Sequence, residues 1–403
     1  MRGKIINDPV YGFIRFPEKE MMRAIEHPWF QRLRRIKQMG MAQLVYPGAV
    51  HTRFHHSLGA AHLMHIALNE LGSKDIDITR ADCLDARLAI LLHDIGHGPF
   101  SHGLEHSIVQ DISHEDISRL IMKRLNEHFD GALSGAIAIF DNSHPKTFLH
   151  QLVSSQLDMD RLDYLNRDSF YTGVSEGVIG YDRILQMLMV KEGGLVVEEK
   201  GIHSVEKFII ARRLMYWQVY LHKTVLGAEQ LIIHILRRAK ELARKGAELF
   251  ATPALRFFLY EQIGAADFGA NASVLDRFCL LDDTDISASI KVWAGHADPI
   301  LARLCTMMQD RKLYKVKLST QPLQDEYEKL KQAMLHSGSI TEEELPYYLF
   351  SGSTRNSTYN QDDERINILM KNGDIVNISQ VDNALITPGL TVPVEKFYIC
   401  RIK

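Results

Sequence analysis

Apolar residues three and four positions apart recur through most of this chain, and one such stretch ends on a histidine beside an aspartate. In residues 85–95 the helical pattern stops before Gly96, and Gly98-Pro99 prevents simple continuation of a helix. His93 and Asp94 therefore lie at the end of an apolar helix. An adjacent imidazole and carboxylate can form half of a site for a divalent metal ion, although such a pair alone is more often a capping or hydrogen-bonded pair.

The rest of the chain also favours helices. We expect a mainly α fold with a helical core, short β-hairpins and a small C-terminal α/β appendage. The sequence becomes polar and less regular after Leu318, so we place the division between residues 1–320 and residues 321–403. The predicted elements are helices over 56–71, 115–129 and 148–166, a long helical stretch over 205–245 broken near Gly227, and hairpins over 188–197 and 366–378 that turn at Gly193-Gly194 and Asn372-Gly373.

Composition narrows the class of protein. The chain has 403 residues, of which 46% are hydrophobic, so a large core can be buried. The formal net charge of -3 argues against stable nucleic-acid binding. No apolar run is long enough for a signal peptide or a membrane span, and the four cysteines form no Cys-x-x-Cys pair. We expect a cytoplasmic protein that does not contact a membrane.

Histidines are concentrated around the histidine–aspartate pair. Ten of the nineteen histidines fall between His51 and His114, where an even scatter would place about three. The remaining ligands can therefore be sought upstream at His56 and downstream at Asp160. Two imidazoles and two carboxylates suit iron, manganese, cobalt, zinc or nickel better than calcium. Open coordination positions on such an ion would suit metal-assisted hydrolysis.

Several ordered blocks resemble the HD superfamily of metal-dependent phosphohydrolases. More narrowly, they resemble the deoxynucleoside triphosphate triphosphohydrolases of the sterile-alpha-motif/HD type, although we expect no sterile-alpha-motif domain here. The resemblance runs from about residue 4 to residue 223 and weakens afterwards. Its specific blocks include Arg53-Phe54-x-His56-Ser57-Leu58-Gly59, the run from His93 to His102, Asp158-x-Asp160-Arg161-x-Asp163-Tyr164, and Tyr220-x-His222-Lys223.

The resemblance implies roles for the metal and acid–base residues. His56, His93, Asp94 and Asp160 would bind the metal ion. Three histidines would act around the α-phosphate, and one of them would protonate the leaving 5′ oxygen. These are His97, His114 and the general acid His102, which pairs with Glu105 where the family has an aspartate.

The resemblance also implies a substrate pocket for a deoxynucleoside triphosphate. The charge of a triphosphate, about four negative charges, calls for several fixed cations, and we expect Mg²⁺ to accompany it. Arg53, Arg161 and Arg212 match cationic positions that hold the triphosphate, and Arg161 replaces a lysine of the family. The positions around the sugar are matched by Gln38, Tyr164, Asp168 and Tyr220.

A regulatory nucleotide site at a subunit interface is a further implication of the resemblance. It would bring an activating nucleotide and a homo-oligomer, either a dimer or a tetramer. An ordinary alternative is that residues 31–37 form one basic face of an N-terminal helix. The matching positions are Lys4, Asn7, Glu26, Gln31 and Arg34.

Our leading hypothesis is hydrolysis of deoxynucleoside triphosphates to deoxynucleoside and inorganic triphosphate, with metal-activated water attacking the α-phosphate. One alternative is a phosphomonoesterase or phosphodiesterase acting on another nucleotide or on single-stranded nucleic acid. Gly96 and His97 stand where guanosine-tetraphosphate hydrolases tend to have an acidic pair, which argues against that substrate. The other alternative is a non-catalytic nucleotide sensor.

Overall fold

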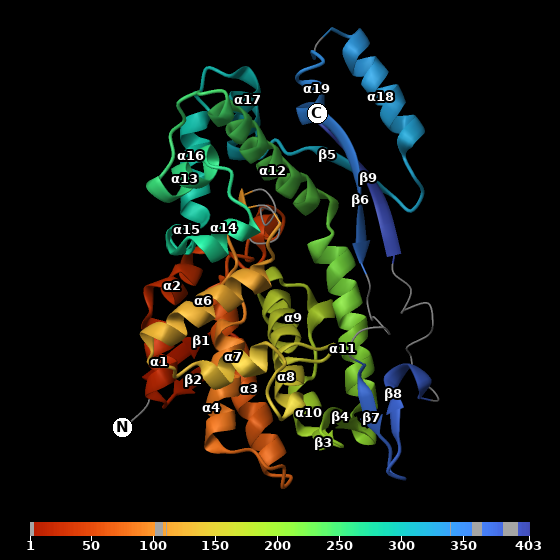
Figure 1. Cartoon of the computed structure of the whole chain (residues 1–403). Helices are drawn as coiled ribbons and strands as arrows, with labels where there is room; N and C mark the ends of the chain where they lie inside the picture. The colour runs from red at the N-terminus through yellow and green to blue at the C-terminus, as the bar shows by residue number, and fades with distance from the viewer. Residues whose placement is uncertain (1–3, 101–107, 110, 339, 357–364, 382–393) are drawn as a thin grey trace.

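The computed structural model describes residues 4–100, 108–109, 111–338, 340–356, 365–381 and 394–403. Helices dominate this part of the chain, and three small sheets accompany them (Figure 1), which confirms the predicted mainly α fold. The helices up to residue 186 are α1 (Lys19–Glu26), α2 (Pro28–Gln31), η1 (Arg32–Arg35), η2 (Gly40–Leu44), α3 (Arg53–Gly72), α4 (Arg80–Leu92), α6 (His114–His128), α7 (Ser134–Phe140), α8 (Thr147–Val153), α9 (Met159–Thr172), η4 (Ser175–Gly177) and α10 (Tyr181–Gln186). Those that follow are η5 (Glu199–Gly201), α11 (Ile202–Met215), η6 (Tyr216–Tyr220), α12 (Lys223–Arg244), α13 (Pro253–Tyr260), α14 (Ala265–Ala270), α15 (Ala272–Phe278), α16 (Asp283–Trp293), α17 (Pro299–Gln309), α18 (Gln324–His336), α19 (Leu345–Tyr348) and η7 (Ile378–Gln380).

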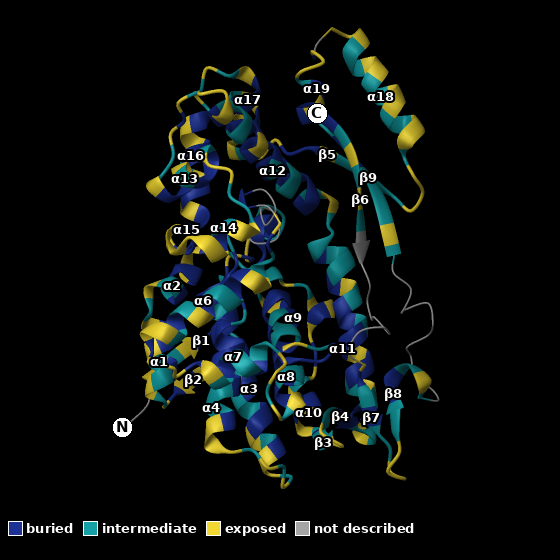
Figure 2. Cartoon of the chain, in the orientation of Figure 1, coloured by how far each residue is buried: buried dark blue, intermediate teal, exposed yellow. Residues whose placement is uncertain are grey.

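Three helices form the frame of the site. α3 is largely buried (Figure 2) and packs against α4 and α9. α4 begins at a capping box, because Thr79 Oγ1 accepts from Asp82 N at 3.1 Å and Asp82 Oδ2 accepts from Thr79 N at 2.7 Å. It ends at Leu92, so His93 and Asp94 follow it directly. The packing of these helices brings the histidine–aspartate pair next to the start of α3 and the first turn of α9.

The prediction of one helix over 148–166 is wrong. The structure has two helices there, α8 and α9, separated by residues 154–158. Asp158 causes the break, because its side chain accepts from Ser155 N at 2.8 Å and from Arg161 N at 2.7 Å. A carboxylate that satisfies the first free N–H groups of a helix favours a new start at that position. α9 therefore begins just before Asp160.

The long helical stretch also breaks at a different place from the one predicted. α11 runs into a π-helical turn, η6, and α12 begins after His222, whose Nδ1 accepts from Thr224 N at 3.2 Å. Gly227 lies inside α12, where an added Cβ would approach Tyr314 O to 3.2 Å and Val316 Cγ2 to 3.0 Å. This glycine therefore permits close packing and does not interrupt the helix.

The strands form three sheets. Both predicted hairpins are present, as β3 (Leu188–Lys191) with β4 (Gly194–Glu198) and β7 (Asn367–Leu369) with β8 (Ile375–Asn377). β4 pairs with β7 in parallel, which joins the two hairpins into one sheet. A hairpin of β1 (Lys4–Asp8) and β2 (Gly12–Phe16) was not predicted, nor was the sheet in which β9 (Val394–Arg401) lies between β5 (Lys315–Ser319) and β6 (Leu349–Asn356). β5 lies before residue 320 and pairs with β9, which lies after it, so this sheet contains residues from both sides of the predicted division. The division of the chain into domains 1–320 and 321–403 stays a prediction.

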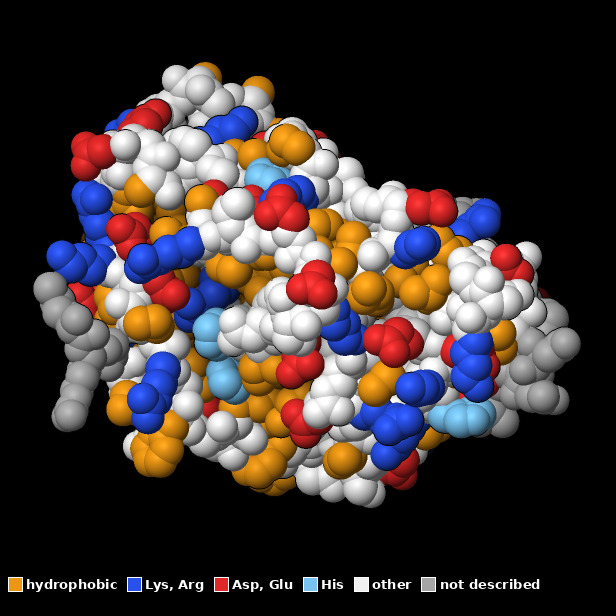
Figure 3. Space-filling view, turned by 90° about the horizontal axis from the view of Figure 1, so that it is seen from below, with side chains coloured by type: hydrophobic (Ala, Val, Ile, Leu, Met, Phe, Trp, Pro, Cys, Tyr) orange, Lys and Arg blue, Asp and Glu red, His pale blue; other side chains and the backbone are white. Residues whose placement is uncertain are grey.

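The surface carries charges of both signs. On the face seen in Figure 3, basic and acidic side chains are mixed, with apolar side chains between them. Within the described ranges, no helix combines the length and apolar character that crossing a bilayer requires.

Candidate metal centre

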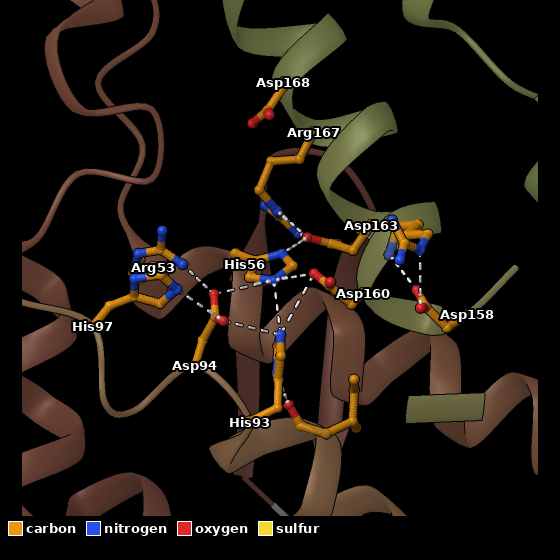
Figure 4. A network of polar contacts seen from close by, with 12 residues as sticks. Arg53, His56, His93, Asp94, His97, Asp158, Asp160, Asp163, Arg167 and Asp168 are labelled. Carbon is orange, nitrogen blue, oxygen red and sulfur yellow. Dashed lines mark hydrogen bonds and ion pairs between the residues drawn. The ribbon is translucent and has the colours of Figure 1, made fainter. Parts of the chain in front are cut away.

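Four side chains from separate parts of the chain converge beside α3. His56 Nε2 lies 3.0 Å from Asp160 Oδ1 and 3.4 Å from His93 Nε2. His93 Nε2 lies 3.4 Å from Asp160 Oδ1 and also 3.4 Å from Asp94 Oδ1 (Figure 4). His56 comes from α3, His93 and Asp94 follow α4, and Asp160 lies in the first turn of α9. The structure thus brings together all four residues predicted as metal ligands.

The donor set fits a divalent transition-metal ion. The other ring nitrogen of each histidine is already held, because His56 Nδ1 lies 2.8 Å from Asp163 Oδ2 and His93 Nδ1 lies 2.6 Å from Ile90 O. These contacts turn both Nε2 atoms toward Asp160, as the second contact of a metal-ligating histidine usually does. The donor atoms of His56, His93 and Asp160 lie close enough together to hold one ion, and Asp94 Oδ1 lies beside them, 3.4 Å from His93 Nε2.

A second polar cluster extends from Asp94. His97 Nε2 lies 3.3 Å from Asp94 Oδ1, and the His97 and His114 rings stack with centroids 3.9 Å apart. Burial and the nearby Arg53 guanidinium lower the pKa of His97 well below its ordinary value, so the ring is neutral at pH 7. Burial alone would raise the pKa of Asp94, but its ion pair with Arg53 holds that pKa well below the usual range. Asp94 therefore stays a carboxylate within reach of both clusters.

Both clusters open into one cavity of about 460 Å³. Its volume is in the range of small-molecule sites. Most of the predicted substrate residues line it, namely Gln38, Arg53, Arg161, Tyr164, Asp168 and Tyr220, together with Asp94, His97, His114 and Asp160. Arg212 is not among the lining residues and instead donates from Nη1 to Gln156 Oε1 at 3.1 Å.

Two of the four residues predicted around the sugar, Asp168 and Tyr220, form a short network with His51. Tyr220 donates its hydroxyl to Asp168 Oδ2 at 2.7 Å, and His51 Nε2 lies 2.7 Å from Asp168 Oδ1. His51 was not predicted, although it is the first histidine of the enriched segment. Asp163 was likewise given no role, although it lies within a quoted block and contacts both His56 and Arg167.

Two groups of predicted residues remain. His102 and Glu105 fall outside the described residues. Among the five positions of the predicted regulatory site, Lys4 Nζ lies 3.1 Å from Glu26 Oε1, Arg34 Nε donates to Gln31 Oε1 at 2.8 Å, and Asn7 is exposed on β1. These contacts are compatible with a solvated polar face, and the regulatory nucleotide and the oligomer stay predictions.

Comparison with known proteins identifies the family of this chain. Residues 53–168 match the HD domain, and residues 179–251 match the HD associated region. The crystal structure of a phosphohydrolase from Bacteroides thetaiotaomicron VPI-5482 is similar over 100% of both chains, with 50% identity and a TM-score of 0.95. The uncharacterized protein YwfO of Bacillus subtilis is 32% identical over 94% of this chain and 87% of its own length.

A more distant relative has a named activity. The deoxynucleoside triphosphate triphosphohydrolase SAMHD1 homolog of Dictyostelium discoideum is 31% identical over 266 residues. That match covers 61% of this chain, which spans about half (51%) of the relative's length. The matched HD domain contains the four converging side chains and half of the residues that line the cavity. The chain belongs to the HD-domain phosphohydrolase family.

Proposed function

We propose that this protein hydrolyses deoxynucleoside triphosphates to deoxynucleoside and inorganic triphosphate. The proposal rests on the set of residues that line one cavity. Asp94 and Asp160 of the candidate metal centre line it together with Arg53, Arg161 and the hydrogen-bonded Tyr220–Asp168 pair. A metal centre, fixed cations and sugar-binding groups are the three parts that a nucleotide hydrolase needs.

The metal would be held by His56, His93, Asp94 and Asp160. Iron, manganese, cobalt, zinc and nickel all suit this donor set. When bound, such an ion supplies Lewis-acid polarisation of a phosphate oxygen and of the attacking water. Mg²⁺ would accompany the triphosphate, because phosphate oxygens are its preferred ligands.

The cations would bind the phosphates. A triphosphate carries about four negative charges at neutral pH, so it needs several fixed positive partners. Arg53 is buried beside Asp94, and Arg161 is held by Asp158, with Nε 3.2 Å from Asp158 Oδ2. These carboxylates fix the two guanidinium groups before substrate binds and so reduce the ordering cost of binding.

The neutral His97 and the neighbouring His114 would stabilise charge that develops on the α-phosphate. The protonation of the leaving 5′ oxygen is assigned to His102, oriented by Glu105, as the family resemblance implies. The named activity of the Dictyostelium relative supports the choice of deoxynucleoside triphosphates over other phosphate esters.

Chromatographic analysis of the products tests the proposal. Wild-type protein should release deoxynucleoside and triphosphate, and Asp160→Ala should release neither and should bind less metal. Asp182→Ala is the matched control, because Asp182 is exposed in α10. Release of monophosphate with pyrophosphate, or normal turnover by folded Asp160→Ala, would contradict the proposal.

A further inference from the structure

Glu229 is a carboxylate of the cavity that the proposed reaction leaves unused. It lies on α12, is partly buried, and lines the same cavity as Asp160 and Tyr220. Within the described ranges it has no hydrogen bond or ion pair to another residue. Burial raises the pKa of Glu229 from its ordinary value to about 7. A ligand that brings hydrogen-bond donors to a buried carboxylate without partners stabilises its ionised form.

Glu229 follows Tyr220 among the residues that line the cavity, and Tyr220 and Asp168 are the pair proposed to bind the sugar. Tyr220, which donates to Asp168, lies at the end of η6, and the next lining residues along the chain are Leu221, Val225 and Glu229. Val225 and Glu229 are four residues apart, so they share one face of α12, with Glu229 about 6 Å farther along the axis.

The cavity wall next to α12 is apolar. Gly40 and Ala42 of η2 and the preceding Met39 line the cavity, and η2 packs against α12. Apolar side chains from two elements suit the faces of a flat nucleobase, while a single carboxylate can contact only its edge. Glu229 is the one charged residue that α12 and η2 contribute to the described lining.

The chemistry of a carboxylate distinguishes the four bases. An ionised carboxylate only accepts hydrogen bonds, through two oxygens side by side. Guanine offers two donors on one edge, the ring N1–H and the 2-amino group. On the corresponding edges adenine and cytosine offer an amino group beside an acceptor nitrogen, and thymine offers one N–H between two carbonyls.

We propose that Glu229 binds the Watson–Crick edge of the nucleobase and makes the cavity selective for guanine. This inference rests on the proposed function, because it takes the substrate to be a deoxynucleoside triphosphate. Guanine would give the carboxylate two donors and would favour its ionised form. The other bases would leave a buried acceptor facing an acceptor, which is the arrangement that sites with hydrogen-bonding groups reject most strongly.

The test compares dGTP with dITP, whose base lacks only the 2-amino group. In the wild type above the raised pKa of Glu229, at about pH 8, kcat/KM for dGTP should exceed that for dITP by about tenfold, the usual size of one lost hydrogen bond to a charged group. Glu229→Gln keeps the shape but replaces one acceptor by a donor, so this ratio should fall to about one and dATP should gain relative to dGTP. Glu248→Gln, at an exposed position after α12, should keep the wild-type ratio.

Calorimetric binding of the same nucleotides to the same three proteins separates the two proposals. If no deoxynucleoside triphosphate is hydrolysed but dGTP binds more tightly than dITP only when Glu229 is present, the proposed function fails and the role of Glu229 stands. If the nucleotides are hydrolysed and Glu229→Gln leaves the dGTP to dITP ratio unchanged, or the wild type prefers another base, the role of Glu229 is wrong. Failure to bind any of these nucleotides would overturn both.

Discussion

Asp163 Oδ2 lies 2.8 Å from His56 Nδ1, with both side chains fully buried. Asp163 is held in turn by Arg167, whose Nε and Nη2 donate to its two oxygens at 2.9 Å each. The carboxylate therefore keeps the His56 ring in one orientation, with Nε2 toward Asp160 and His93. This contact lies behind the metal centre and does not itself provide a ligand.

Replacing Asp163 by Asn should weaken metal binding without removing a ligand. An amide is a poorer partner for an imidazole N–H, and loss of such a contact usually lowers metal affinity about 10- to 100-fold. Competition with a chelator followed by elemental analysis measures the change. Asp325→Asn, at an exposed position of α18, should have the wild-type affinity. Equal affinities for Asp163→Asn and wild type would show that this contact does not orient His56.

Gly96 and Gly98 provide a matched pair of substitutions beside the metal centre. A Cβ on Gly96 would lie 2.2 Å from His114 O and 2.3 Å from Ser118 N, both backbone atoms that cannot move aside easily. A Cβ on Gly98 would lie 3.5 Å from the nearest Phe278 carbon, an ordinary contact. Gly96→Ala should lower the free energy of unfolding by at least about 2 kcal/mol, and Gly98→Ala by less than about 1 kcal/mol. Urea denaturation distinguishes them, and similar losses would contradict the close approach at Gly96.

Asp283 joins two segments that line the cavity. Its Oδ1 accepts from Phe100 N at 2.7 Å and its Oδ2 from Lys37 N at 3.0 Å. Asp283→Ala leaves two backbone donors without their acceptors, which should cost about 2 to 4 kcal/mol of unfolding free energy and lower kcat/KM. Exposed Asp276 provides the control, because Asp276→Ala should change stability by no more than about 0.5 kcal/mol. A stable, fully active Asp283→Ala protein would show that these two bonds do not position the cavity wall.

The raised pKa of Glu229 predicts a pH-dependent difference in stability. The folded protein holds the proton up to about pH 7, whereas the unfolded chain releases it near the ordinary value of 4.5. The stability that protonation contributes is therefore complete below pH 4.5 and is lost as the pH rises through 7. Glu229→Gln cannot ionise, so its unfolding free energy relative to wild type should rise by about 1 to 3 kcal/mol between about pH 5 and about pH 8. A difference that does not change with pH would contradict burial of this carboxylate.

Local patterns in the sequence were enough to predict much of the frame. Apolar periodicity located α3 and α4, although α4 spans Arg80–Leu92 and so begins and ends earlier than the predicted stretch 85–95. The break between α8 and α9 was missed because residues 154–157 contain no glycine or proline. It depends on a cap at Asp158 that the apolar pattern does not reveal. Local signals thus locate helices better than the boundaries that side-chain hydrogen bonds set.

Contacts between distant residues were harder to predict. The contact of His56 with Asp163 joins residues 107 positions apart, and the contact of His51 with Asp168 spans 117. The pairing of β5 with β9 also joins remote segments. The four metal ligands could be proposed because they lie in blocks that resemble a known family. His51, Asp163 and Glu229 acquire a defined place only through the packing of α3, α9 and α12.

The central claim is that a metal centre containing Asp160 hydrolyses the substrate at the α-phosphorus. The most direct test is phosphorus NMR of the products that wild type and Asp160→Ala form from dGTP in oxygen-18-labelled water. Attack of water on the α-phosphorus with departure of the 5′ oxygen places one labelled oxygen in inorganic triphosphate and none in deoxyguanosine. We predict this labelled triphosphate for the wild type and no product for Asp160→Ala. Labelled monophosphate or pyrophosphate from the wild type, or labelled triphosphate from Asp160→Ala, would contradict a triphosphohydrolase centre built on these ligands.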